Sequence, residues 1–431
     1  MGASRRAVAA WVLYDFADSA FATVVATFVV AAYFTQAVAA DPVTGAAQWA
    51  ATQAASGLLI ALLAVPMGAL ADRGGWRAPM LGICIAITSL CTIALWWVRP
   101  DPAYVPLALI LVATATIAFE VATVFYNAML PDLVAPTRLG RLSMIAWGVG
   151  YIGGLACLVI ALLVLVMPDP APFGLDKSQS EHIRAAAILA GLWVAAFGWP
   201  AIVFIPERQT AQPQAHQPWR TTIRASLAEL RTTLRAAIRD PNLRNLLLAR
   251  MLFMDGLITL FAFGGIYAAG EFKFSAQDVL LFGIGLNVTA GIGVFAFAFI
   301  EDRIGPKTTV IISLAALVAL ALPLLLIQDP AWFWCLGLAL GLFVGPAQAA
   351  SRSLMAHMAP PEARAAWFGL FALSGRVTAF LGPAALALAT TAFQSQRAGM
   401  AVILIFLTAG ALALIPLRVE SRIAKAIKHS E

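Results

Sequence analysis

Charged side chains lie inside long apolar segments of this 431-residue chain, where they could bind a polar solute or carry protons. The first such segment, residues 11–36, has Asp15 and Asp18 near its middle. An ionised carboxylate at the centre of a bilayer costs at least about 2.5 kcal/mol unless it faces a protein interior or a water-filled cavity. Two carboxylates in one apolar segment therefore predict a polar cavity that they face.

Other apolar segments add acids and an arginine at a similar depth. Asp255 and Arg376 each lie about twelve residues from the predicted cytoplasmic end of their segment, or ~18 Å at the rise of an α-helix. Asp18 and Glu120 fall within a turn or two of that level, near the midplane where transporters bind substrates and coupling ions. The residues predicted to bind a substrate or to couple its movement to an ion are Asp15, Asp18, Glu120, Asn127, Asp255, Gln348 and Arg376.

Each of these residue types suits a different part of a transport cycle. The planar guanidinium of Arg376 is well suited to hold a substrate carboxylate, and Glu120 or Asp255 would receive an amine or a proton. Glu120 shares one face of its predicted helix with Asn127, by the spacing of helical turns. The alternative is that Arg376 only neutralises Asp255 or Glu120 and fixes the packing of helices.

A second group of charges is predicted to form gates. Asp72 and Arg73 lie between two apolar segments of the first half of the chain, and Asp302 and Arg303 lie at the corresponding place in the second half. These residues could simply cap the helices before them, but their repetition favours a paired gate on the inward side. Arg250 is about eight residues from the end of its segment and is predicted to be a gate or an interfacial anchor.

The composition argues against several other classes of function. The four cysteines and four histidines show no metal-binding spacing, so neither a metal nor another cofactor is predicted. Gly148, Gly150 and Gly153 have the spacing of a dinucleotide fingerprint, but they lie inside an apolar segment with no preceding strand. No nucleophile, base and orienting group gather in any stretch, so no enzyme is predicted. Most basic residues fall in short loops, which indicates membrane orientation and not a nucleic-acid partner.

The elements that must position these residues are membrane helices. The chain is 61% hydrophobic and 12% charged, which predicts an all-α polytopic membrane protein. Hydropathy predicts twelve transmembrane helices in two pseudo-symmetric halves of six, residues 1–206 and 243–418, joined by a linker at 207–242 and followed by a tail at 419–431. The predicted spans are 11–36, 48–71, 78–98, 104–130, 141–167, 183–206, 243–269, 276–300, 306–327, 331–356, 364–392 and 398–418.

Loop charges and periodicity predict how these helices are placed. The excess of lysine and arginine in alternate loops predicts that both termini are cytoplasmic. The apolar run after Arg5 and Arg6 is too long for a secretory signal and is interpreted as the first span. In the linker, apolar and arginine residues at helical spacing between Trp219 and Arg239 predict an amphipathic helix on the bilayer surface. That helix is interpreted as a connector, with a regulatory element as the alternative.

Several motifs carry a resemblance to a known family. The loops 68–77 and 302–307 resemble the signature loops of the major facilitator superfamily. The stretches 14–21, 125–131, 255–256 with 263–268, 351–353 and 368–383 resemble the bacterial relatives of the autophagy-related vacuolar amino-acid effluxer. The resemblance implies the major facilitator fold in a bacterial inner membrane. One departure is Asp18, where the family usually has asparagine, so that an extra titratable group is available for coupling.

Together, the residues and the resemblance predict a secondary active transporter that works by alternating access. The expected substrate is a small polar metabolite such as an amino acid or a short peptide, the expected coupling ion is the proton, and the expected assembly is a monomer in the lipid bilayer. One alternative is a multidrug exporter of broad specificity, with a larger, more aromatic pocket that tolerates the loss of Arg376. A non-transporting membrane receptor or scaffold is the other.

Overall fold

The computed structural model describes residues 3–206, 235 and 237–418, and this part of the chain is helical without a strand. The first half consists of α1 (Arg5–Ala20), α2 (Val30–Tyr33), α3 (Pro42–Gly74), α4 (Arg77–Ala94), α5 (Val105–Leu133), α6 (Leu139–Ile160) and α7 (Glu181–Phe204). The second half consists of α9 (Pro241–Phe272), α10 (Ala276–Ile304), α11 (Pro306–Leu324), α12 (Pro330–Met358), α13 (Arg364–Ser374), α14 (Leu381–Phe393) and α15 (Gln396–Leu414). Helical stretches of other geometry connect or extend these helices.

The first span is longer than predicted, because α1 continues without a loop through η1 (Phe21–Phe28), α2 and η2 (Phe34–Val38). Several other helices begin at an Asp-Pro pair. Asp41, Asp240 and Asp329 each accept a hydrogen bond from a backbone N–H of the helix that follows, while the proline needs no such partner. This chemistry sets the starts of α3, α9 and α12.

The predicted continuous span 364–392 is wrong. The structure divides it into α13 and α14, with residues 375–380 in turns between them, so Arg376 lies in the break and not on a helix face. Pro383 lies in the first turn of α14, where its missing N–H costs no helical hydrogen bond. Among the described residues, eleven helices are long and apolar enough to cross a membrane, and the broken pair occupies the place of the twelfth.

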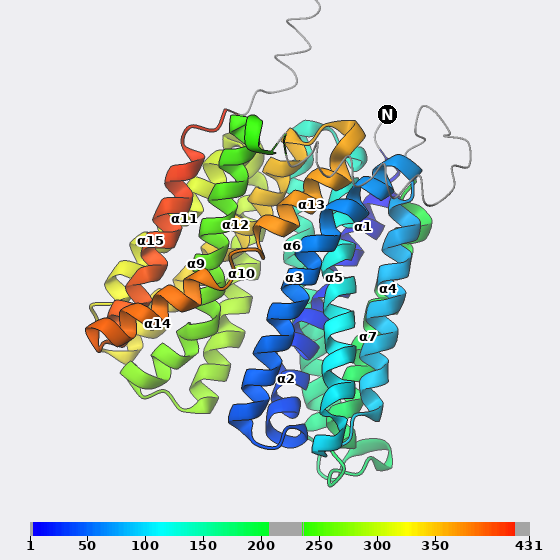
Figure 1. Cartoon of the computed structure of the whole chain (residues 1–431), viewed down its shortest axis with the longest axis vertical. Coiled ribbons are helices and arrows are strands. Elements are labelled where there is room, and N and C mark those ends of the chain that lie inside the picture. Colours follow the sequence, from blue (N-terminus) through cyan, green and yellow to red (C-terminus); the bar gives the residue numbers. More distant parts are fainter. Residues whose placement is uncertain (1–2, 207–234, 236, 419–431) are drawn as a thin grey trace, which may run out of the picture.

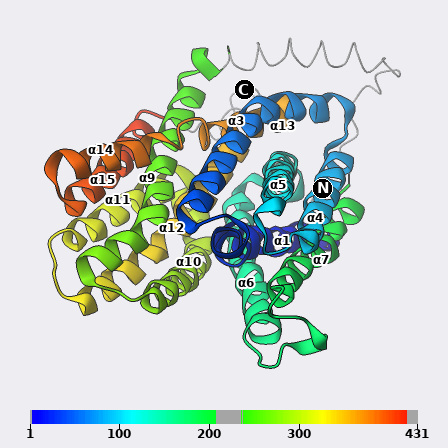
Figure 2. The same cartoon turned by 60° about the horizontal axis from the view of Figure 1, so that its bottom comes forward.

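The helices pack as two bundles (Figures 1 and 2). In the first, α1 packs against α6 and α7, and α4 packs against α5 and α7; in the second, α9 packs against α15, and α12 packs against α10 and α11. The bundles meet where α13 packs on α3 and α5, and where α6 packs on α10 and α12.

Both described ends of the chain lie at the same end of this assembly, which we name the terminal end (Figure 1). The N–H of Ala3 donates to the carbonyl of Leu133 over 3.3 Å, and the N–H of Arg418 donates to Oδ1 of Asn242 over 2.8 Å. An even number of membrane crossings, such as twelve, requires both ends of the chain to lie on the same side. The assignment of that side to the cytoplasm stays a prediction. The predicted linker helix and basic tail fall largely on residues 207–234, 236 and 419–431, which lie outside the described residues.

Candidate functional site

A buried ion pair joins the two halves near the terminal end. Arg352 of α12 contacts Asp15 of α1 with 3.1 Å between Nη1 and Oδ2. Arg352 also donates from Nε to the hydroxyl of Ser143 on α6 over 2.9 Å and from Nη2 to the Ser143 carbonyl over 2.6 Å. Arg352 is only 2% exposed and Asp15 is 8% exposed. The sequence predicts a role for Asp15 in binding or coupling. It predicts no role for its partner Arg352, which lies in the family motif 351–353.

Aromatic rings complete the surroundings of the Arg352 guanidinium. Its central carbon lies 5.0 Å from the ring centre of Trp11, 4.8 Å from that of Trp147 and 5.7 Å from that of Tyr126. A cation over an aromatic face is attracted to it, more strongly where water is absent. The first half therefore supplies a carboxylate, a serine and three rings to one cation of the second half.

Asp72, one of the predicted gate residues, also bridges the halves. Its Oδ1 lies 2.5 Å from Nη2 of Arg77, and its Oδ2 accepts from the backbone N–H of Ala366 in α13 over 3.0 Å. Asp132 of α5 then contacts both Arg77 and Arg364 of α13. The contacts of Asp72 with Ala366 and of Asp132 with Arg364 exist only while α3 and α5 lie against α13, whereas the two contacts with Arg77 lie within the first half.

Asp302 of the second predicted gate also makes contacts between the halves. Asp302 at the end of α10 accepts from the backbone N–H of Arg141 over 3.0 Å and pairs with its Nε over 3.1 Å. Its neighbour Arg303 is exposed, and Arg73 is half-buried in the last turn of α3. We name the inter-half contacts around Asp15, Asp72 and Asp302 the closed interface.

Glu120 of α5 pairs with Arg376 in the break between α13 and α14. The arginine side chain is 36% exposed and the glutamate side chain 15% exposed. In this conformation Arg376 therefore has Glu120 as its partner, a pairing that is compatible with both a substrate-binding and a structural role. Asp255 of α9 is 2% exposed, lies with its backbone against Gly382 of α14, and makes no ion pair within the described chain.

The remaining predicted residues have varied surroundings. The guanidinium of Arg250 lies 3.6 Å from the ring centre of Phe371, and its Nε and Nη1 have no hydrogen-bond partner within the described chain. Asn127 is half-buried on α5 with its Oδ1 unpartnered there, and Gln348 is half-buried on α12.

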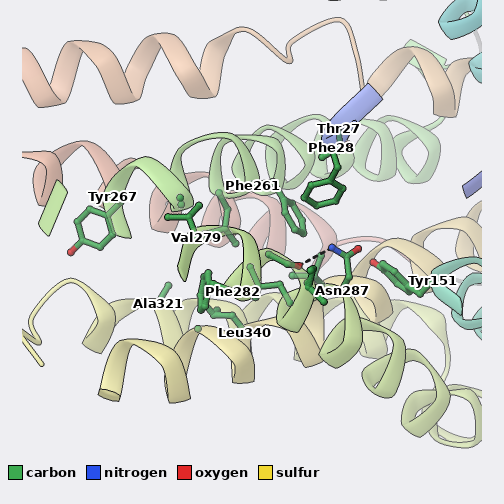
Figure 3. A pocket seen from close by; sticks show the side chains of 18 of the residues that line it. Thr27, Phe28, Tyr151, Phe261, Tyr267, Val279, Phe282, Asn287, Ala321 and Leu340 are labelled. Carbon is green, nitrogen blue, oxygen red and sulfur yellow. Dashed lines mark hydrogen bonds between the residues drawn. The ribbon is translucent and has the colours of Figure 1, made fainter. Parts of the chain in front are cut away.

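A cavity of about 480 Å³ lies between the halves, next to the closed interface on the side remote from the terminal end. Its lining lies in the parts of the helices remote from the terminal end, for example Leu260 to Tyr267 of α9. Figure 3 shows Phe28 of the first half together with Phe282 and Asn287 of the second. The lining residues are Ser19, Ala22, Thr23, Thr27, Phe28, Gly150, Tyr151, Leu155, Leu158, Leu260, Phe261, Gly264, Gly265, Tyr267, Val279, Phe282, Gly283, Ile284, Leu286, Asn287, Ala321, Leu324, Leu325, Phe333, Gly337, Leu340, Val344, Met400, Ile403 and Leu404.

The cavity lining carries no charged side chain in the described part of the chain, and the predicted binding residues are not in it. Its polar groups are hydroxyls, such as Ser19, Thr23 and Thr27 of the first span, and the amide of Asn287. The four-residue spacing of those three hydroxyls was a signal available in the sequence, since it places them on one helix face.

Comparison with known proteins agrees with this architecture. A family model described as "Vacuole effluxer Atg22 like" matches residues 42–426. The uncharacterized MFS-type transporter YxiO of Bacillus subtilis is 24% identical over 395 residues, 91% of this chain and 90% of YxiO. Autophagy-related protein 22-2 of Aspergillus clavatus is 26% identical over 290 residues, and the match spans 62% of this chain but only 46% of the fungal protein.

Solved structures of the major facilitator superfamily share the fold. FucP in its outward conformation superposes with a TM-score of 0.73 at 12% identity, covering 95% of this chain and 98% of FucP. The human organic anion transporter MFSD10 superposes with a TM-score of 0.71 at 18% identity, covering 96% of this chain and 99% of MFSD10. The chain therefore belongs to the Atg22-like vacuole effluxer family of major facilitator transporters.

Proposed function

We propose that this integral membrane protein is a secondary active transporter that moves a small metabolite by alternating access and is driven by protons. The observation that carries the proposal is the one-sided arrangement of the interface between the halves. Charged contacts close it at the terminal end, and a cavity of about 480 Å³, within the usual size of small-molecule sites, lies toward the other end. Rocking of the halves about the cavity would exchange the closed and open ends.

The charged residues are proposed to couple this movement to the substrate. Release of Glu120 from Arg376 would free a guanidinium for a substrate carboxylate, while Asp255 would accept an amine or a proton. The expected substrate is thus a small polar metabolite such as an amino acid or short peptide.

Uptake into proteoliposomes tests the proposal. Purified protein is reconstituted, and radiolabelled amino acids and dipeptides are presented with and without an imposed pH gradient. Accumulation of a solute against its concentration gradient only when a pH gradient is present supports proton coupling. Transport that is the same with and without the pH gradient contradicts proton coupling. Counterflow with no gradient distinguishes a transporter from a receptor, which would bind without exchange.

Two substitutions test the assigned roles. Asp255→Asn should abolish accumulation, and Arg376→Ala should abolish transport of carboxylate substrates, because each removes a group that the cycle needs. Glu271→Gln is the control, since Glu271 pairs with Arg397 over 2.9 Å within the second half at the other end. Full activity in both Asp255→Asn and Arg376→Ala would contradict the assignment.

A second candidate function, export of varied amphipathic compounds, is favoured by the cavity lining. Phe28, Phe261, Phe282 and Phe333 supply aromatic faces there, and no charged group selects for a zwitterion. Such an exporter should move ethidium or a similar dye and should keep that activity in Arg376→Ala. Dye transport without amino-acid transport would favour this candidate over the first.

A further inference from the structure

Three buried charged groups lie together at the boundary between the closed interface and the cavity. Asp15 and Asp18 are three residues apart on α1, so they share a face of that helix, and each is 8% exposed. Arg352 pairs with Asp15 and is 2% exposed. Asp18 makes no ion pair within the described chain, and its one hydrogen-bond neighbour is Ser19, with 3.5 Å between Ser19 Oγ and Asp18 Oδ1.

Other elements add no second cation to this cluster. The titratable or charged groups around Asp18 and its neighbour Tyr14 belong to α1, α4, α5 and α12. The groups are Tyr14, Asp15, Cys84, Tyr126 and Arg352. Tyrosine and cysteine are ordinarily neutral near pH 7. Two carboxylates therefore share a single guanidinium.

The charge balance of such a cluster depends on one proton. If both carboxylates were ionised, the buried group would carry a net negative charge, and two like charges in one buried site do not both persist. With one proton on Asp18, the Asp15 carboxylate and Arg352 balance each other and no net charge is buried. The proton belongs to the cluster as a whole, with Asp18 as the member that lacks a cation partner.

The position of the cluster gives that proton two routes. Ser19, next to Asp18, lines the cavity, whereas Asp15 and Arg352 belong to the closed interface. Opening the terminal end would withdraw α12, and Arg352 with it, from α1. Water from the terminal end would then reach both carboxylates. Because hydrated carboxylates can both be ionised, Asp18 would release its proton.

We propose that Asp18 carries the transported proton, receiving it from the cavity past Ser19 and releasing it at the terminal end when Arg352 withdraws from Asp15. This inference rests on the proposed transport function and names the coupling residue within it. Because the closed conformation then holds one more proton than the open one, low pH favours closure. The ratio of closed to open molecules should fall by up to about tenfold per pH unit as the pH rises, the limit for one proton.

Distances between spin labels test this without a known substrate. Labels are placed on cysteines introduced at Thr137 and Glu362, which are exposed at the terminal end of opposite halves, after the four native cysteines are replaced. Distance distributions are recorded in lipid nanodiscs from pH 5 to pH 9. The parent protein should gain a longer distance as pH rises, and Asp18→Asn should change less than twofold over that range.

Two further variants keep the result interpretable. Asp18→Glu should restore the pH dependence, because it restores the carboxyl group. Glu301→Gln tests the competing carboxylate, since Glu301 is also buried between the halves, 1% exposed beside Gly140, and accepts a hydrogen bond from Ser353 next to Arg352; it should retain the parent response if Asp18 is the residue that titrates. An unchanged pH response in Asp18→Asn, or its loss in Glu301→Gln, would overturn the proposal.

Transport measurements separate this inference from the proposed function. If the reconstituted protein exchanges no solute, the transport function fails, whatever the labels report. If it transports a solute but Asp18→Asn retains the parent dependence on the pH gradient, transport stands and Asp18 is not the coupling residue.

Discussion

The two ends of the interface between the halves are built from opposite chemistry. At the terminal end the halves meet through buried charges, such as Arg352 with Asp15, and through close backbone contact. Toward the other end they face a cavity whose lining is uncharged and largely aromatic and aliphatic. Charges thus lie where the halves must come together and part, and the uncharged surface lies where a solute would be enclosed.

This division follows from what each end must do. A buried ion pair contributes little net stability compared with apolar packing, but breaking it by removal of one partner is strongly destabilising. Such pairs therefore distinguish sharply between a joined and a separated interface. An uncharged cavity binds through shape and a few hydrogen bonds, which can form and break within each cycle.

The largest expected effect comes from breaking the central ion pair. Arg352→Gln leaves the Asp15 carboxylate buried without its cation, a change that typically costs about 3 to 5 kcal/mol. The cost falls on the closed conformation, because Asp15 gains water when the terminal end opens. We expect the distance between labels at positions 137 and 362 to shift almost completely to its longer value at neutral pH.

Arg397→Gln is the comparison for that experiment. Arg397 pairs with Glu271 over 2.9 Å inside one half, with both side chains more than a quarter exposed. Exposed pairs are worth about 0 to 1 kcal/mol, and this pair does not span the interface. A similar shift in both variants would show that charge removal acts by general destabilisation and not through the interface.

A smaller effect should follow from adding one methyl group at the interface. Gly68 of α3 lies so close to α13 that a Cβ would overlap the backbone of Ala365, whereas Gly57 of the same helix has open space around it. Overpacking typically costs about 1 to 3 kcal/mol, and here only the closed conformation bears it. Gly68→Ala should therefore favour the longer label distance by about 5-fold to 160-fold.

Gly57→Ala supplies the matched substitution in the same helix. It should leave the label distance unchanged and should raise thermal stability slightly, because alanine favours a helix over glycine by about 1 kcal/mol. Equal label distances in Gly68→Ala and Gly57→Ala would mean that α3 and α13 do not separate during the cycle.

The sequence predicted the fold well because span length, apolar composition and loop charge are local signals. It also singled out Asp15, Asp72 and Asp302, since a charge in or beside an apolar segment is conspicuous, while their roles in coupling and gating stay predictions. It could not show that Arg352 is the partner of Asp15, because the two are 337 positions apart and only packing brings them together. The division of the span containing Arg376 was missed because both pieces are apolar.

The sequence alone did not predict the cavity either, because its lining comes from several helices. Asn287, Tyr151 and the aromatic residues around them resemble ordinary membrane-helix residues one at a time, so only their convergence marks a site. Asn287 donates from Nδ2 to the carbonyl of Gly283 in its own helix over 2.9 Å. Its Oδ1 has no partner among the described residues and is therefore available to a solute in the cavity.

The smallest predicted effect tests this end of the comparison. Asn287→Leu keeps the side chain's approximate size but removes the acceptor, and a neutral hydrogen bond is worth about 0.5 to 1.5 kcal/mol. We expect KM to rise about twofold to twelvefold for solutes that can donate a hydrogen bond, with little change in kcat or in the label distance. Val288→Leu, at an adjacent position that is 43% exposed and does not line the cavity, should leave KM unchanged. If Asn287→Leu instead changed the label distance as Arg352→Gln does, the cavity would be part of the closing machinery, and the separation of binding from closure would not hold.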